Sequence, residues 1–195
     1  MCHIKIQNLS FSYQTQKPIL THFSASIEIG SKTAITAPSG YGKTTLLLLL
    51  AGLLKPQEGT ILFPSSCKKV SMVFQENRLL PSINIVKNIK LVNPKLSDNA
   101  ILSLLKKAGL SFYALRKPAY LSGGEQRRIA IIRALAADYD LLLLDEPFTG
   151  LDIDTKKQMI DFITEQTTNK TVILVSHNPE DFIGYKIIPI FPPNL

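Results

Sequence analysis

Residues 37–45 read Ala-Pro-Ser-Gly-Tyr-Gly-Lys-Thr-Thr and could bind phosphate. Glycines let successive backbone N–H groups point into one concavity, and a helix that follows adds the partial positive charge of its N-terminus. Lys43 would reach the β- and γ-phosphates of a nucleotide, and Thr44 would offer a hydroxyl to Mg²⁺. The strict pattern begins with Gly where this chain has Ala37, which would cost about 1–2 kcal/mol if that position needs a positive φ. The alternative is a glycine-rich turn that begins a buried helix.

Two adjacent carboxylates follow a second apolar run. Residues 141–146 read Leu-Leu-Leu-Leu-Asp-Glu, which is typical of a buried parallel strand. Ligands of open α/β sheets bind at the carboxyl ends of the strands. Asp145 could there hold Mg²⁺ through water, while Glu146 could polarise an attacking water. The alternative is a strand followed by an acid that caps a helix.

A third segment, Leu-Ser-Gly-Gly-Glu-Gln-Arg-Arg at 121–128, opens a predicted helix. Ser122 and Glu125 have the spacing of a capping box, which explains those two residues structurally. It does not explain two adjacent glycines, which cost conformational entropy. Backbone N–H groups without side chains at a helix N-terminus favour an anion, so the segment is a second candidate phosphate-binding element.

The elements that would position these residues follow an α/β pattern. Apolar alternation predicts strands at about 4–9 and 19–29, with a turn at Lys17 and Pro18 between them. Short strands are predicted at 32–37, 70–74, 141–144 and 171–176, and helices at 43–54, 125–137 and 154–168. From 76 to about 119 apolar residues recur at helical spacing, up to Gly109. We therefore expect a single domain over residues 1–195, in which a helical insert at about 76–133 interrupts a core formed by about 1–75 and 134–195.

Composition sets limits on the class of protein. The apolar fraction of 45% and the charged fraction of 19% are typical of a globular chain. The longest apolar run, at 46–54, is about half of what a membrane-spanning helix needs, and the N-terminus does not resemble a secretory signal. The two distant cysteines, Cys2 and Cys67, indicate a reducing compartment and no metal site.

The net charge of +7 is unevenly distributed. Residues 68–133 hold thirteen lysines and arginines against three acids, whereas residues 134–195 hold four lysines against ten acids. One interpretation is an ordinary solvated surface; the other is a middle segment that faces an anionic partner such as lipid headgroups or nucleic acid.

The string Leu-Ser-Gly-Gly-Glu-Gln at 121–126 resembles the signature motif of the ATP-binding-cassette (ABC) ATPases, and further motifs follow that family's order over nearly the whole chain. Residues 37–45 resemble its Walker A loop, residues 141–146 its Walker B strand and residues 150–152 its D-loop. Gln75 resembles the glutamine of its Q-loop, and His177, after Ser176, its switch histidine. Tyr13 stands where the family places an aromatic residue that stacks on adenine.

The resemblance implies an α/β fold with a P-loop NTPase core and a mainly parallel sheet, an N-terminal antiparallel β subdomain and a helical subdomain insert. It implies ATP and Mg²⁺ as cofactors. The implied catalytic residues are Glu146, as general base, with His177, Gln75 and Lys43. The implied nucleotide-binding residues are Tyr13, Pro38, Ser39, Gly40, Tyr41, Gly42, Lys43, Thr44, Thr45, Ser122, Gly123, Gly124, Glu125 and Asp152. The implied Mg²⁺ residues are Thr44, Gln75 and Asp145.

Three of these residues also have plain structural explanations. His177 could be a surface histidine at a strand end, Tyr13 an ordinary core or surface residue, and Gln75 a polar residue after a strand. Only their place among the other motifs favours a role in chemistry.

In this family ATP lies between the Walker A loop of one protomer and the signature motif of the other. A chain with one copy of each motif is therefore expected to form an ATP-sandwich homodimer that opens on hydrolysis. The resemblance implies integral membrane permease subunits as partners, docked on the helical insert, and allows a solute-binding protein in the same system. We expect a cytoplasmic protein, peripheral on the inner face of the cell membrane, with no nucleic-acid partner.

The alternative functions come from other classes. A non-transport ABC ATPase acting on DNA or ribosomes is disfavoured, because only 46 positions separate Gln75 from Leu121, which leaves no room for a long coiled coil, and because the chain has one cassette. A non-hydrolysing switch is disfavoured because Glu146 and His177 are retained.

The sequence leaves the substrate and the direction of transport open. Residues 73–81 resemble the Q-loop region of importers for nitrate, sulfonates and taurine, whereas Glu125 with Gln126 resembles lipoprotein-releasing and macrolide-export ATPases. Only 18 residues follow His177, fewer than in many members of the family.

Overall fold

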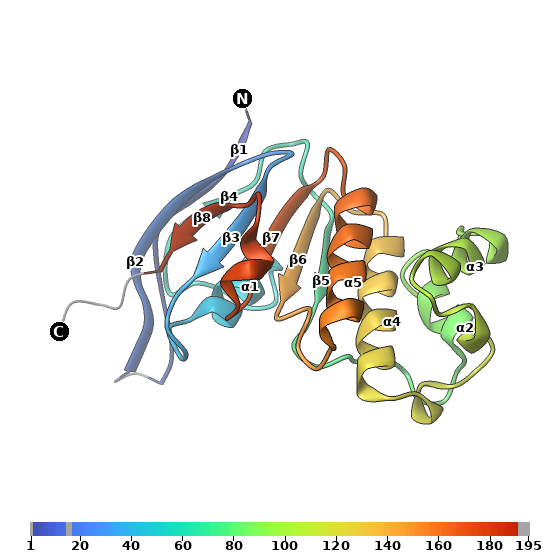
Figure 1. Ribbon diagram of the computed structural model, residues 1–195. Coiled ribbons are helices and arrows are strands. Elements are labelled where there is room, and N and C mark those ends of the chain that lie inside the picture. Colours follow the sequence, from blue (N-terminus) through green and yellow to red (C-terminus); the bar gives the residue numbers. More distant parts are fainter. Residues whose placement is uncertain (1, 15–16, 191–195) are drawn as a thin grey trace. The chain divides into compact units, whose positions relative to one another are not determined.

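The computed structural model describes residues 2–14 and 17–190. It divides into two compact units: the first comprises Met1–Met72, Asp140–Asp145 and Asn169–Leu195, and the second Val73–Tyr139 and Glu146–Thr168. Figure 1 shows the elements of both units. The first unit carries the strands and the second carries most of the helices.

A three-stranded antiparallel sheet forms from β1 (His3–Gln14), β2 (Lys17–Glu28) and β4 (Glu58–Leu62), in the order β2-β1-β4. The predicted turn at Lys17 and Pro18 is wrong, because both residues belong to β2 and pair with Gln14 and Ser12 of β1. Strand β4 was not predicted, because Pro56, Glu58 and Gly59 were interpreted only as residues that end a helix.

A five-stranded sheet has the order β5-β6-β7-β3-β8, with β5 (Val70–Val73), β6 (Leu141–Asp145), β7 (Thr171–Val175), β3 (Lys32–Thr36) and β8 (Lys186–Pro189). The pairs β6/β7, β7/β3 and β3/β8 are parallel. Val175 pairs with both Asp145 and Ile35, so the segments that follow β3, β6 and β7 leave the sheet at the same edge. The predicted α/β fold with a mainly parallel sheet and an antiparallel β part is confirmed, while β8 was not predicted.

Helix α1 (Lys43–Leu50) packs within the core of the first unit. It is shorter than the predicted 43–54, because Ala51 caps it and Gly52 turns the chain away with a φ of +70°. The helix is buried on nearly all sides, which explains its run of leucines without amphipathic spacing. One cluster of buried side chains joins α1 to β1, β2, β3, β6 and β7.

The second unit contains α2 (Ile85–Lys90), α3 (Asp98–Lys107), α4 (Gly123–Ala136), α5 (Ile153–Gln166) and the short 3₁₀ helices η1 (Ser111–Tyr113) and η2 (Pro118–Tyr120). Each α-helix begins at a side chain that accepts from a backbone N–H of the first turn: Asn84, Ser97, Ser122 and Asp152. These caps satisfy N–H groups that a helix start otherwise leaves unpaired. Across residues 2–14 and 17–190, every helix is too short or too polar to span a membrane.

Candidate active site

The loop between β3 and α1 has the backbone of a phosphate loop. Gly40 and Gly42 adopt left-handed φ values of +83° and +80°. A Cβ on Gly42 would lie 2.9 Å from Cγ2 of Ile19 and 3.1 Å from Cδ2 of Leu20, so the position accepts only glycine without a shift of β2. Ala37 is not among the residues of positive φ, so this alanine carries no left-handed strain at the first loop position.

Lys43, the first residue of α1, lies within this loop although it is charged. The residue is only 6% exposed. Its Nζ donates to the carbonyl oxygens of Ala37 at 2.8 Å and Pro38 at 3.1 Å. A buried ammonium is tolerated only when its donors are satisfied. The loop therefore holds a positive charge at the N-terminus of a helix, which suits an anion.

Thr44 and Asp145 bring two motifs together within the first unit. Oγ1 of Thr44 donates to Oδ1 of Asp145 at 3.2 Å, and Asp145 is buried at the end of β6. A hydroxyl and a carboxylate are oxygen ligands of the kind that Mg²⁺ prefers. Two segments whose contacting residues are 101 positions apart in the sequence are thus joined by a direct hydrogen bond.

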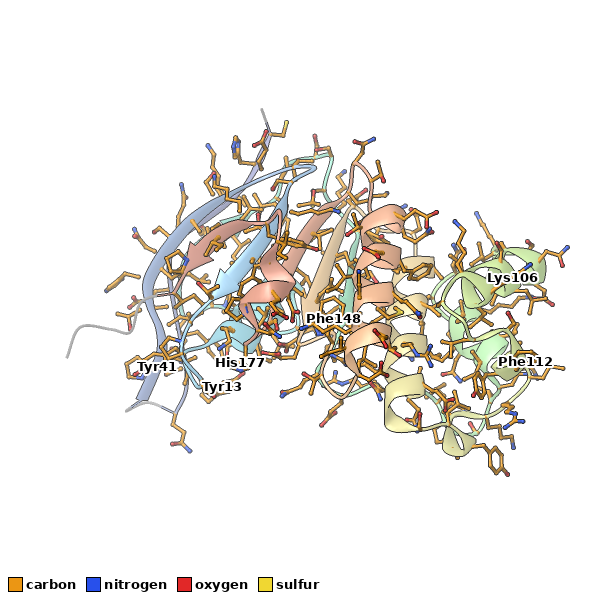
Figure 2. The ribbon with its side chains drawn as sticks, in the orientation of Figure 1. Tyr13, Tyr41, Lys106, Phe112, Phe148 and His177 are labelled. Atoms are coloured by element: carbon orange, nitrogen blue, oxygen red, sulfur yellow. The ribbon has the colours of Figure 1, made fainter. Side chains whose placement is uncertain are left out.

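Tyr13 stands near the end of β1 and reaches the same loop. Its hydroxyl lies 3.3 Å from Oγ1 of Thr45, and its ring meets the ring of Phe11 edge-on, with 5.0 Å between centroids. The residue, which Figure 2 labels, is 60% exposed, so much of its side chain is accessible to solvent. The side chain is neither a core residue nor an isolated surface residue.

His177 follows β7 and faces the start of the phosphate loop. It lines a groove of ≈ 500 Å³ together with Thr36, Ala37 and Pro38. Two hydrogen bonds of Ser176 stabilise the turn that carries His177. Its Oγ donates to Oδ2 of Asp181 at 2.5 Å and accepts from the N–H of Asn178 at 3.1 Å. The exposed imidazole therefore stands on an anchored turn.

In the second unit, the segment at 121–126 begins α4 as predicted. Oγ of Ser122 accepts from the N–H of Glu125, and Oε2 of Glu125 accepts from the N–H of Ser122 at 2.7 Å, which completes the capping box. A hydrogen bond from Tyr113, followed by the bond from Ser122, lowers the pKa of Glu125. The carboxylate stays charged at neutral pH and the cap stays closed.

The two glycines of this segment have different surroundings. A Cβ on Gly123 would meet no atom within 4 Å, so its backbone is open to a ligand. A Cβ on Gly124 would lie 3.4 Å from the carbonyl oxygen of Gly150, so α4 begins close against the segment that leads to α5. Asp152 in that segment caps α5 by accepting from the N–H of Thr155 at 2.9 Å.

Glu146 has an unusual backbone. It follows β6 directly and adopts a φ of +49°, in the left-handed region that a non-glycine residue enters at a cost of about 1–3 kcal/mol. Its carbonyl oxygen accepts from Nη2 of Arg127 at 2.6 Å. The same guanidinium also binds the carbonyl oxygen of Gln75 through Nη1, at 3.2 Å, whereas the Gln75 side chain itself is exposed.

The predicted site residues thus fall into two groups, each described within its own unit. The first unit brings together the phosphate loop with Tyr13, Asp145 and His177. The second unit holds the segment 122–125, Glu146, Gln75 and Asp152. Sequence analysis missed Arg127, because one buried arginine among thirteen basic residues in 68–133 gives no signal by its type alone.

Comparison with known proteins places the chain in a family. The family model described as ABC transporter matches residues 20–149. The chain belongs to the ABC transporter family. The thiamine import ATP-binding protein ThiQ of Brucella suis is 37% identical over 207 residues, which cover 98% of this chain and 85% of that protein. ThiQ of Escherichia coli K12 is 38% identical over 175 residues, which cover 82% of this chain and 75% of that protein.

Solved structures of ABC proteins share the fold. One is the dimeric structure of the cassette MJ0796 in a post-hydrolysis state, bound to ADP and Pi. It matches with a TM-score of 0.85 and 29% sequence identity, and the match covers 96% of this chain and 94% of the MJ0796 chain. A bacterial Atm1-family ABC exporter with ATP bound has a TM-score of 0.84 and 26% identity, covering 97% of this chain and 37% of its own. The prediction of an ATP-hydrolysing, nucleotide-binding subunit of an ABC transporter is confirmed.

Proposed function

We propose that two copies of this chain hydrolyse ATP between them and so power the import of thiamine through membrane subunits. The observation that carries the ATPase site is the pair of contacts made by neighbouring residues of α1. Lys43 lies inside the phosphate loop, and Thr44 donates to Asp145 at 3.2 Å. The cargo is inferred from the relatives named for thiamine import, one of which matches 98% of this chain.

The phosphate loop binds the triphosphate of ATP. Backbone N–H groups of residues 39–45 donate to the phosphate oxygens at the N-terminus of α1. Lys43 exchanges its carbonyl partners for the β- and γ-phosphates, with Ser39 and Thr45 in the same loop. Tyr13, whose hydroxyl is held 3.3 Å from Thr45, offers its exposed ring to the adenine.

The residues present fit a magnesium ion. A hydroxyl from Thr44 and a carboxylate from Asp145, with oxygens of the nucleotide phosphates, are the ligands that Mg²⁺ usually takes in nucleotide sites, and Gln75 would add its side-chain oxygen. Bound there, Mg²⁺ neutralises charge that develops on the phosphate oxygens.

Hydrolysis depends on Glu146 and on groups that stabilise the γ-phosphate. The Glu146 carboxylate accepts a proton from water as the water attacks the γ-phosphorus, and the bond to the ADP oxygen breaks. Gln75 orients that water. His177 donates to the γ-phosphate from the anchored turn after β7.

The start of α4 supplies the second half of the site from the other copy. Ser122, Gly123 and Gly124 present backbone N–H groups and a hydroxyl at a helix N-terminus, and the open surroundings of Gly123 leave room for a phosphate. The Glu125 carboxylate fixes this helix start through the capping box. Asp152, the cap of α5, couples the two nucleotides across the dimer. The dimeric MJ0796 cassettes among similar structures support this arrangement.

A groove of ≈ 570 Å³ in the second unit is the proposed docking site for the membrane subunits. It is lined by α2, α3 and η1 and combines Lys87 and Lys90 with Leu102, Phe112 and Leu115. Phe112 is 91% exposed and Leu115 is 80% exposed. Figure 2 labels Phe112. Large exposed apolar side chains next to basic ones suit a helical segment of a permease close to anionic headgroups. The protein would then lie on the inner face of the membrane, with a solute-binding protein delivering cargo on the other side.

Transport in reconstituted vesicles tests this function. The complete complex with its membrane subunits is placed in liposomes, and uptake of radiolabelled thiamine is followed with and without ATP. We expect uptake that requires ATP and disappears with Glu146→Gln. ATP hydrolysis by the complex without any accumulation of thiamine would refute the proposed cargo.

A further inference from the structure

Arg127 forms a hub within the second unit. It lies in the second turn of α4 and is 3% exposed. Its Nε donates to the carbonyl oxygen of Pro147 at 3.0 Å, and its Nη2 to that of Glu146 at 2.6 Å. Its Nη1 donates to the carbonyl oxygens of Phe74 at 2.5 Å and Gln75 at 3.2 Å. One side chain thus holds the backbone of two segments about 70 positions apart in the sequence.

The chemistry of the guanidinium explains why arginine suits this position. Its five N–H donors lie in one plane with fixed angles, so donors on different edges can reach two loops at once. Burial of the charge is compensated by these bonds, since a buried cation without partners would be costly. Four of the acceptors are main-chain oxygens, and Nη1 also donates to Oδ1 of Asn77 at 3.4 Å, so Arg127 mainly fixes the course of the two backbones.

The segment at Glu146 needs such support. Glu146 adopts a φ of +49°, which is unfavourable for a residue with a Cβ, and the peptide that follows it carries the oxygen bound by Nη2 of Arg127. A strained conformation persists only when its surroundings hold it in place. The direction in which the Glu146 carboxylate leaves the backbone is therefore set in part by Arg127.

We propose that Arg127 is a positioning residue for ATP hydrolysis. By binding the main chain of both Glu146 and Gln75, it keeps these two residues in a fixed position relative to each other. The inference rests on the proposed roles of Glu146 as general base and of Gln75 as the residue that orients water. It adds a residue that touches neither nucleotide nor water. It also ties both segments to α4, the helix that begins with Ser122.

Arg128, the next residue of α4, provides a matched control. Its Nη1 donates to the carbonyl oxygen of Ala108 at 3.1 Å, at the end of α3. Like Arg127, it is an arginine of α4 that donates to a main-chain carbonyl oxygen. Its bond, however, anchors the end of α3 and not the segments of Glu146 or Gln75. Loss of this contact tests the general cost of removing a half-buried arginine from α4.

The experiment compares Arg127→Met, Arg127→Lys and Arg128→Met with the wild-type chain, measuring kcat for ATP and the Kd of a fluorescent ATP analogue. Displacement of reacting groups by about 1 Å costs on the order of a hundredfold in rate, so we expect kcat of both Arg127 variants to fall by about ten- to a hundredfold. The Kd should change by less than about threefold, because the phosphate loop belongs to the other unit. Arg127→Lys keeps the charge but not the fork, and so should not rescue kcat. Arg128→Met should keep kcat within about twofold of the wild type.

Two results would overturn the role of Arg127. A kcat within about twofold of the wild type in Arg127→Met would do so, as would an equal loss in Arg128→Met. If Arg127→Met does not fold, Arg127→Gln decides, since its amide keeps two N–H donors: a lower kcat at unchanged Kd supports positioning, and an unchanged kcat refutes it. Glu146→Gln is measured in parallel. If that variant hydrolyses ATP like the wild type, the proposed function fails; if it is inactive while Arg127→Met is normal, only the inference about Arg127 fails.

Discussion

The hydroxyl of Thr44 donates a 3.2 Å hydrogen bond to Oδ1 of Asp145, a residue 101 positions further along the chain. The parallel sheet brings them together, because β3 leads into the phosphate loop and β6 ends at Asp145, with β7 between them and in register with both. Three neighbouring strands, in the order β6-β7-β3, therefore end at one edge of the sheet, where they carry a carboxylate, a histidine and the phosphate loop.

The Thr44–Asp145 pair predicts a selective effect on magnesium-dependent activity. Replacing Thr44 by Ala removes the hydroxyl and should lower ATP hydrolysis at least about tenfold, with a higher Mg²⁺ requirement, because metal sites lose about ten- to a hundredfold when such groups are removed. Thr44→Ser keeps the hydroxyl and is the matched control. Titration of activity against Mg²⁺ checks this, and equal activity of the Ala and Ser variants would contradict it.

The two glycines of the loop predict unequal costs for alanine. Gly40 and Gly42 share a left-handed φ, so each Ala variant should lose about 1–2 kcal/mol of unfolding free energy from backbone strain. Gly42→Ala should lose a further ~1–3 kcal/mol, because its Cβ would be 2.9 Å from Cγ2 of Ile19, whereas a Cβ on Gly40 meets open space. Urea unfolding of both variants checks the difference. Equal midpoints would show that the close approach to β2 does not matter.

Asp140 predicts a pH dependence of stability. Its Oδ2 accepts from the N–H groups of Lys69 at 2.9 Å and Lys68 at 2.8 Å, and these two bonds lower the pKa of Asp140. A carboxyl whose folded pKa lies below its unfolded value of about 3.9 stabilises the protein above that pH and loses this effect as the pH falls through the folded pKa. Asp140→Asn should therefore lose about 1 kcal/mol near neutral pH.

The comparison of the two proteins across pH checks the sign. As the wild-type carboxylate becomes protonated, the difference in unfolding free energy between wild type and Asp140→Asn should shrink toward zero. Unfolding in urea at about pH 7 and about pH 3 measures it. A difference that stays constant, or one that grows toward acid, would rule out this account of Asp140.

The groove of the second unit predicts a docking variant. Phe112→Asp places a charge on a side chain that is 91% exposed in the free chain, so it should leave stability and basal ATP hydrolysis unchanged. Burial in an apolar contact would make the same charge costly, and co-purification with the membrane subunits should fall at least about tenfold. Leu53→Asp, also an exposed apolar residue at 56%, is the control. Normal assembly of the Phe112→Asp variant with the membrane subunits would contradict the proposal that they dock in this groove.

Much of the fold could be predicted from local pattern. The strands β3, β6 and β7 are short apolar runs that end in polar residues, and their order with α1 is typical of a parallel sheet. The antiparallel sheet is harder to predict from the sequence, because its strand pairing depends on contacts between distant segments. Gly59 was interpreted as the end of a helix, yet it lies in β4, where a Cβ would be 2.3 Å from the carbonyl oxygen of Asn8 on β1. Lys17 and Pro18 likewise begin strand β2, since Pro is tolerated at a strand start.

The site shows the same division. The residues of the phosphate loop and the capping box of Ser122 and Glu125 follow from spacing alone, because each acts within a few positions of its partner. The strained φ of Glu146 and the contacts of Arg127 could not be predicted, because they depend on how α4 packs against two distant segments. No local pattern distinguishes an arginine that anchors loops from one that is solvated.

The central claim is that ATP joins two copies of this chain, and the mass of the Glu146→Gln variant tests it most directly. Size-exclusion chromatography with light scattering, run with Mg²⁺ and ATP, should give about twice the 21.6 kDa of one chain, while Mg²⁺ with ADP should give the single chain. The variant should bind ATP and release no phosphate. A mass of one chain with saturating ATP, or turnover equal to that of the wild type, would contradict the account.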